Sequence, residues 1–142
     1  MLSRVHSKYL YILILGLFFQ NCTQADERNN ALISPGQLMQ LLETDQNILL
    51  VDVRTEGEFT GKLGHINNSI LRPIQQIDEW KSEFDWKDYD KVIMICRSGN
   101  RSGVATNTLK SEGVKNVYNL QGGMRAWNKE GLPVVKASEQ EK

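Results

Sequence analysis

Cysteine and histidine are both scarce in this chain, whose 142 residues include two histidines and two cysteines, Cys22 and Cys96. Two cysteines cannot form the disulfide framework that holds many small secreted domains together, so the fold has to depend on a hydrophobic core. No cluster of His and Cys residues has the spacing of metal ligands. The composition therefore argues against a disulfide scaffold and predicts no metal site.

An excess of basic charge is also missing. The chain has 17 Lys and Arg residues and 17 Asp and Glu residues, so its formal net charge is zero. Residues 1–21 hold Arg4 and Lys8 but no acid, which leaves 15 basic against 17 acidic residues, a net charge of −2, in the remainder. Nucleic-acid-binding domains carry a basic patch, and this balance does not provide one. The sequence therefore predicts no nucleic-acid partner.

A third absence is an apolar run long enough to cross a bilayer, which takes about 20 residues. The unbroken run from Tyr9 to Phe19 has eleven residues, and it follows the basic residues Arg4 and Lys8. This length and this flank are typical of a signal peptide. We therefore expect residues 1–22 to be a signal peptide that exports the protein to the periplasm.

The end of this segment allows two ways of processing. The segment resembles a bacterial lipoprotein signal in which Cys22 carries the lipid, and contact with the membrane would then be made through that anchor. A cut after Ala25 is the alternative, because Thr23-Gln24-Ala25 places small residues at both required positions. Both alternatives remain open, and in each of them Cys96 is the one free thiol of the mature protein.

The composition changes after the signal segment. Residues 23–30 are polar and without periodicity, which predicts a flexible tether. We expect one domain over residues 31–138 and a disordered tail over residues 139–142. Ser34-Pro35-Gly36-Gln37 has the pattern of a capping box with proline at the first helical position, so a helix is expected to begin there.

Short apolar runs, typical of parallel strands, alternate with helical patterns along the rest of the domain. The expected strands are 47–53, 66–70, 91–96 and 114–120. The expected helices are 77–84, 101–111 and 123–129. Strands that alternate with helices predict an α/β fold with a parallel sheet that helices cover on both faces.

The segment Cys96-Arg97-Ser98-Gly99-Asn100-Arg101-Ser102 follows an apolar strand and precedes a helix. The carboxyl ends of parallel strands are where ligands bind in open sheets. Gly99 allows the backbone to curl so that successive N–H groups form an anion-binding nest, and the following helix adds its positive end. Arg97 and Arg101 add full charges. Such surroundings favour the nucleophilic thiolate and can hold an anionic substrate.

Two classes of enzyme place a cysteine in such a cradle. Cysteine phosphatases have five residues between the cysteine and the arginine, whereas four residues separate Cys96 from Arg101. A smaller ring suits a sulfur atom on the cysteine better than a phosphate. The spacing therefore favours sulfur transfer over phosphate hydrolysis.

Four blocks, in order and at natural spacings, resemble the rhodanese family, specifically its small single-domain members. They cover residues 31–135, nearly the whole mature chain. The four blocks are Leu50-Val51-Asp52-Val53-Arg54 with Glu58-Phe59, Gly64-His65-Ile66, the segment from Cys96 to Ser102, and Leu120-Gln121-Gly122-Gly123-Met124 with Trp127 and Gly131-Leu132-Pro133-Val134.

The resemblance implies a five-stranded parallel sheet and a sulfurtransferase that carries sulfur as a persulfide on Cys96. Sulfur would pass from a small anionic donor such as thiosulfate to cyanide, a thiol or a protein acceptor, with no metal or organic cofactor. The loop residues Arg97, Ser98, Gly99, Asn100 and Arg101 would bind the substrate and the persulfide. The resemblance also implies mainly structural roles for the remaining motif residues, which are Asp52, Arg54, Glu58, His65, Gly122, Gly123 and Trp127.

A non-turnover sulfur carrier that serves a protein partner is the alternative function, because the same loop would serve both roles. Turnover with small thiols would support the enzyme, and loading with sulfur but no turnover would support the carrier. The sequence leaves the physiological donor, the acceptor and the oligomeric state open.

Overall fold

The computed structural model describes residues 31–44 and 46–136. The predictions of a signal peptide at 1–22, of lipidation at Cys22, of a tether at 23–30 and of a disordered tail at 139–142 lie outside these residues. Within the described part of the chain, no helix is long and apolar enough to cross a membrane.

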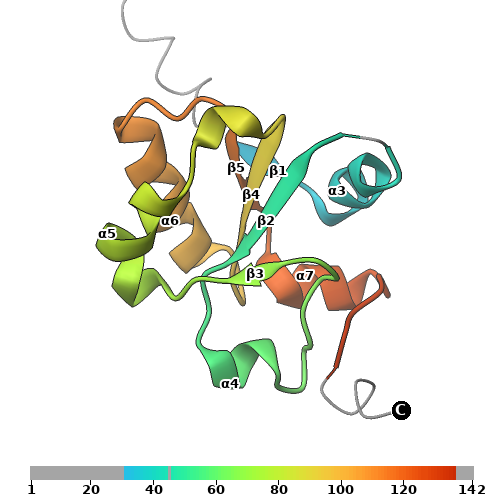
Figure 1. Cartoon of the computed structure of the whole chain (residues 1–142). Coiled ribbons are helices and arrows are strands. Elements are labelled where there is room, and N and C mark those ends of the chain that lie inside the picture. Colours follow the sequence, from blue (N-terminus) through green and yellow to red (C-terminus); the bar gives the residue numbers. More distant parts are fainter. Residues whose placement is uncertain (1–30, 45, 137–142) are drawn as a thin grey trace, which may run out of the picture. The chain divides into compact units, whose positions relative to one another are not determined.

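Five parallel strands form one sheet in the order β1-β5-β4-β2-β3 (Figure 1). The strands are β1 (Leu32–Ile33), β2 (Ile48–Asp52), β3 (Ile70–Leu71), β4 (Lys91–Ile95) and β5 (Val117–Leu120). The expected α/β fold with a five-stranded parallel sheet is therefore confirmed.

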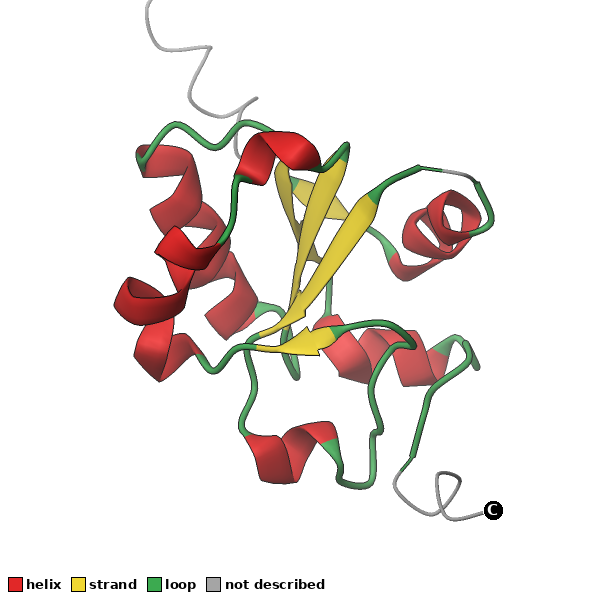
Figure 2. Cartoon of the chain, viewed as in Figure 1, coloured by secondary structure: helices red, strands yellow, loops and turns green. Residues whose placement is uncertain are grey.

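Helices lie on both faces of this sheet, as Figure 2 shows. The longer helices are α3 (Pro35–Leu42), α6 (Asn100–Ser111) and α7 (Gly123–Lys129). The short helices are α4 (Glu56–Phe59) and α5 (Ile77–Trp80), with 3-10 turns η1 (Ile74–Gln76), η2 (Lys81–Glu83) and η3 (Trp86–Asp88). The capping box expected at the start of α3 is present: Gln37 N–H donates to Ser34 Oγ, and Ser34 N–H donates to Gln37 Oε1.

Strand β4 divides the core into two layers because successive side chains of a strand point to opposite faces. Ile93 and Ile95 pack with Leu38 of α3 and Trp127 of α7. Val92 and Met94 pack with side chains from α5 and α6, including Trp80 and Leu109. Because both faces of the strand are covered by helices, residues 92–96 are apolar without alternation.

Four details differ from the sequence predictions. The expected strand at 66–70 is wrong: Ile66 is buried in the core, but its carbonyl oxygen accepts from the N–H of Ser69 in a turn, and β3 begins at Ile70. β5 begins at Val117 rather than at residue 114, and the expected helix 77–84 ends at Trp80 and continues as a 3-10 turn. Strand β1, of two residues, was not among the runs expected from the apolar pattern.

Candidate active site

Cys96 directly follows β4, at the carboxyl end of the sheet. Its side chain is 1% exposed and packs in the layer of α5 and α6. The backbone turns at Gly99, whose φ of 95° is left-handed, and α6 begins at the next residue. Sγ of Cys96 accepts from Gly99 N–H at 3.1 Å and lies 3.1 Å from Oγ of Ser102. The loop therefore encloses the sulfur in hydrogen-bond donors.

Two opposing effects act on the ionisation of Cys96. Burial raises the pKa of its thiol, because a poorly solvated site disfavours the charged thiolate. The Ser102 hydroxyl and the backbone amides of Ser102, Ser98 and Gly99 act against burial, and the net result is a lowered pKa. Because the thiolate is the nucleophilic form, this loop prepares Cys96 to attack an electrophilic atom.

The turn that leads into α7 packs directly on this loop. Met124 N–H donates to the carbonyl oxygen of Cys96 at 2.8 Å, and Arg125 N–H donates to that of Arg97 at 3.0 Å. A Cβ on Gly123 would lie 2.3 Å from the Cys96 carbonyl oxygen, and the φ of Gly123 is 56°. Only glycine allows the two backbones to approach this closely. No pattern in the sequence indicated this contact between the turn and the loop.

Arg101 of α6 pairs with Glu58 of α4. Its two terminal nitrogens donate to the two carboxylate oxygens, each at 2.7 Å. The bond from Arg101 lowers the pKa of Glu58 to about 2, against the smaller opposing effect of burial. No sequence signal indicated this pair, because the two residues are 43 positions apart. Whether Arg101 also contacts a substrate anion stays a prediction.

A buried ion pair fixes the segment that carries Glu58. Asp52 and Arg54 are both 0% exposed and meet at 2.7 Å. The guanidinium of Arg54 also donates to the carbonyl oxygens of Glu58 and Gly64. Arg54 thereby connects the end of β2, the end of α4 and the turn that follows.

A hollow of about 360 Å³ lies beside the loop and is lined in part by Lys62, Leu63 and Arg97. Arg97 and Lys62 are exposed, and within residues 46–136 neither of them has an ion-pair partner. Their charges are available to an anion in this hollow. Lys62 was missed by sequence reasoning because it lies outside the family blocks. Ser98 and Asn100 are also exposed beside Arg97.

His65 and Trp127 make structural contacts. The His65 ring stacks on Phe59 with centroids 3.8 Å apart, its Nδ1 lies 3.2 Å from the Phe59 carbonyl oxygen, and its backbone pairs with Val135. Trp127 is 1% exposed, and its Nε1 donates to the Pro133 carbonyl oxygen. Both rings contact backbone carbonyl groups, and Trp127 packs in the core layer that includes α3 and α7.

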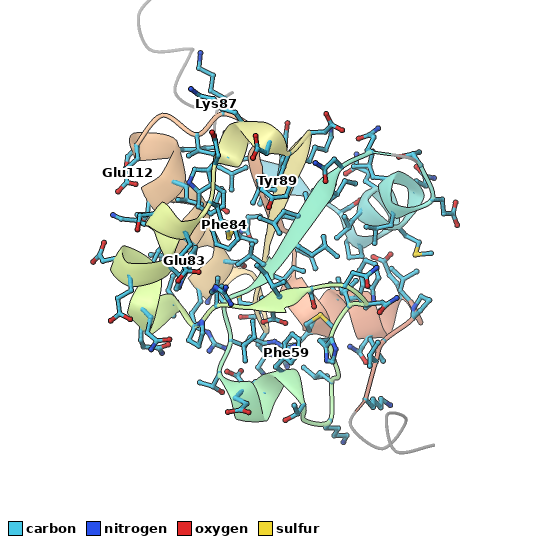
Figure 3. All side chains as sticks on the ribbon, viewed as in Figure 1. Phe59, Glu83, Phe84, Lys87, Tyr89 and Glu112 are labelled. Atoms are coloured by element: carbon cyan, nitrogen blue, oxygen red, sulfur yellow. The ribbon has the colours of Figure 1, made fainter. Side chains whose placement is uncertain are left out.

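A larger hollow, of about 770 Å³, lies away from this chemistry. It is lined by residues that flank the amino ends of β4 and β5, including Phe84, Trp86 and Glu112. Figure 3 shows Lys87 and Glu112 at the end of the domain opposite Phe59 of α4. The described residues contain no group of three metal-ligating side chains.

This combination defines a class of protein: a parallel α/β domain that presents one cysteine in a backbone-amide cradle. The family described as the rhodanese-like domain matches residues 34–130. The chain belongs to the rhodanese-like domain family.

Relatives and solved structures agree with this assignment. The chain is 40% identical over 103 residues to a sulfurtransferase of Allochromatium vinosum, which covers 72% of this chain and 92% of that protein. It is 32% identical over 95 residues, 67% of its length, to YrkF of Bacillus subtilis, a proposed sulfur carrier protein. The crystal structure of a rhodanese-related protein from Thermoplasma volcanium superposes with a TM-score of 0.64 at 33% identity, over 72% of this chain and 95% of that one.

Some relatives are longer proteins. The match spans 49% of YrkF and 58% of a protein from Synechocystis that is 37% identical over 109 residues, 77% of this chain. This chain therefore corresponds to only part of each of these two proteins.

Proposed function

We propose that this protein is a sulfurtransferase that carries sulfur as a persulfide on Cys96 and takes it from a small anionic donor such as thiosulfate. The observation that carries the proposal is the cradle of Cys96, in which backbone amides and a hydroxyl surround one buried sulfur atom. Similarity to a sulfurtransferase over most of the domain supports the same chemistry.

In the first half-reaction, the Cys96 thiolate attacks the outer sulfur of thiosulfate. The S–S bond of thiosulfate breaks, sulfite leaves with the electron pair of that bond, and Cys96 becomes a persulfide anion. In the second half-reaction, cyanide or a thiolate attacks the outer sulfur, and the Cys96 thiolate is released. Each half-reaction uses Cys96 as a covalent intermediate, so ping-pong kinetics are expected.

The charges beside the loop support an anionic donor. Arg97 and Lys62 line the adjacent hollow, and Arg101 is oriented by Glu58 next to the same loop. We assign Arg97, together with the exposed residues Ser98 and Asn100, to donor binding. In this proposal Gly99 and Arg101 hold the loop around the persulfide.

The test is the intact mass of the Cys22→Ser chain, in which Cys96 is the single cysteine, after exposure to thiosulfate. We expect a gain of one sulfur atom that cyanide or a thiol removes, and no gain in the Cys22→Ser/Cys96→Ser control. No gain in a folded protein with a free Cys96 thiol would exclude thiosulfate as donor. Loading without turnover on small thiols would instead favour the sulfur carrier that relatives such as YrkF suggest.

We also propose that the mature protein acts outside the cytoplasm, in the periplasm, after removal of a signal peptide. The apolar run from Tyr9 to Phe19 behind Arg4 and Lys8 supports export. Lipidation of Cys22 and cleavage after Ala25 are the two alternatives for its processing.

A further inference from the structure

Asn119, at the buried end of β5, touches both groups that hold the Cys96 sulfur. Its Nδ2 donates to the carbonyl oxygen of Gly99 at 3.0 Å, and its Oδ1 accepts from Oγ of Ser102 at 2.6 Å. Ser102 Oγ lies 3.1 Å from Sγ of Cys96. Asn119 is 8% exposed and Ser102 is fully buried. These contacts form one chain of groups that leads from the strand to the sulfur.

The Ser102 hydroxyl has two acceptors but only one hydrogen to donate. Oδ1 of Asn119 lies 2.6 Å and Sγ of Cys96 lies 3.1 Å from the Ser102 oxygen, so the hydroxyl can donate to either acceptor but not to both at once. While it donates to Asn119, Sγ of Cys96 faces the lone pairs of Ser102, which suits a thiol that donates its own hydrogen. A thiolate has no hydrogen and needs the hydroxyl to turn toward it.

A 180° rotation of the Asn119 side-chain amide cannot remove this competition for the Ser102 hydrogen. Its Nδ2 is held by the Gly99 carbonyl oxygen, and a turned amide would place Oδ1 against that oxygen. The acceptor therefore always faces Ser102. When the hydroxyl turns to a thiolate, Asn119 Oδ1 loses that bond in a buried place, and an unpaired buried carbonyl is costly.

Building on the proposed function, we propose that Asn119 is a positioning residue that competes with the Cys96 sulfur for the Ser102 hydrogen and so disfavours the free thiolate relative to the sulfur-loaded state. In the persulfide the charge lies mainly on the outer sulfur, so Sγ needs the hydrogen less and Ser102 can keep its bond to Asn119. The competition therefore helps Cys96 to retain sulfur.

We expect the competition to slow the release step, in which the outer sulfur leaves Cys96. A thiolate acceptor attacks the outer sulfur of the persulfide, the S–S bond to Sγ breaks, and Sγ takes the electron pair as the Cys96 thiolate. The acceptor becomes the new persulfide anion. Because Cys96 is the leaving group, a less stable thiolate leaves more slowly.

Charged residues also lie around the loop. Arg101 interacts electrostatically with Cys96, and the other charged residues on the surrounding elements are Arg97, Glu58 of α4, Asp52 and Arg54 at the end of β2, and Arg125 of α7. Substitutions at Asn119 and Ser102 leave all of them in place. A coupling between the Asn119 and Ser102 substitutions in the titration of Cys96 therefore reports the Ser102 hydroxyl rather than these charges.

The test measures the rate of Cys96 alkylation against pH in the full chain with Cys22→Ser. Four proteins form a double-mutant cycle: the parent, Asn119→Leu, Ser102→Ala and the double variant. We expect Asn119→Leu to lower the apparent pKa of Cys96 more when Ser102 is present than in the Ser102→Ala background. The difference between the two pKa changes should be roughly half to one pH unit, the value of one net hydrogen bond. Loss of the bond to Gly99 affects both backgrounds equally and cancels.

Asn116→Leu is the matched control, because the Nδ2 of Asn116 holds the carbonyl oxygens of Trp86 and Tyr89 at the other end of β5. It is expected to lower stability but not to move the titration of Cys96. Asn119→Ala replaces Asn119→Leu in the cycle if the leucine variant does not fold. A cycle with no coupling, or with coupling of the opposite sign, would overturn the proposal.

The second measurement is the discharge of a loaded persulfide to a small thiol at fixed pH. We expect Asn119→Leu to discharge roughly two- to threefold faster than the parent, in proportion to its better leaving group. An equal or slower discharge contradicts the inference. Alkylation of Cys96 needs no sulfur donor. The titration therefore tests the role of Asn119 even if the protein does not transfer sulfur, and the two failures can be told apart.

Discussion

Gly123→Ala is the substitution whose effect the structure defines most closely. The added Cβ would lie 2.3 Å from the Cys96 carbonyl oxygen and 2.8 Å from both the Arg97 carbonyl carbon and the Ser98 nitrogen. All three atoms belong to the backbone, which cannot rotate away as a side chain can. The active-site loop and the start of α7 therefore have to move apart.

The cost has two parts. Alanine at a φ of 56° is left-handed, which costs roughly 1–2 kcal/mol. Separation of the loop from α7 also weakens the bonds from Met124 N–H to Cys96 and from Arg125 N–H to Arg97, each of which contributes about 1 kcal/mol. We therefore expect the free energy of unfolding to fall by roughly 2–4 kcal/mol.

Gly131→Ala is the matched control for the first part of the cost. Gly131 has a left-handed φ of 69°, but nothing lies within 4 Å of an added Cβ. Urea denaturation should give a loss of roughly 1–2 kcal/mol for this variant. Its Cys96 should react with an alkylating agent as in the parent, whereas Gly123→Ala should change that reactivity because the Cys96 loop is displaced.

The reasoning is wrong if Gly123→Ala costs no more stability than Gly131→Ala and leaves the reactivity of Cys96 unchanged. That result would mean that the loop and α7 can separate without loss, so that their close approach does not hold the sulfur cradle in shape.

Two further predictions concern the Glu58 carboxylate and the N-terminus. Since Arg101 lowers the pKa of Glu58 from 4.5 to about 2, the pair stabilises the fold fully above pH 4.5, and this contribution disappears as the pH falls toward 2. Glu58→Gln should therefore cost roughly 1–2 kcal/mol at pH 7, a value reduced by the partial exposure of the pair, and much less near pH 2. Denaturant titrations at both pH values check this against the exposed Glu56→Gln, and a pH-independent loss would contradict it. For the N-terminus, the mass of the protein from the cell envelope should show either a lipid on Cys22 or a chain that begins after Ala25; a full-length, unprocessed chain in the cytoplasm would refute export.

Local patterns were enough to predict much of the fold. The capping box at Ser34 and Gln37, the apolar strands at 48–52 and 91–95, and the helices that follow Gly99 and Gly122 each depend on residues that are close in the chain. Such signals are visible in a sequence because the interactions that create them are short-range.

Short and irregular elements were predicted less well. Strand β1 has only two residues, and its hydrogen bonds are made with β5, far along the chain, so no local periodicity marks it. The apolar residues at 66–70 suggested a strand, but Ile66 is buried by a turn that brings it into the core. An apolar side chain can be buried from either backbone conformation, and tertiary packing decides between them.

The α/β class, the position of Cys96 after a buried strand and the curl of its loop at Gly99 could all be predicted from the amino-acid sequence. Which groups surround the sulfur depends on tertiary packing. Asn119 meets Ser102 across 17 positions, Arg101 meets Glu58 across 43, and Gly123 meets the backbone of Cys96. Hydrogen bonds and steric contacts act over a few ångströms of space, and only the packing of the strands and helices brings these distant residues within that range.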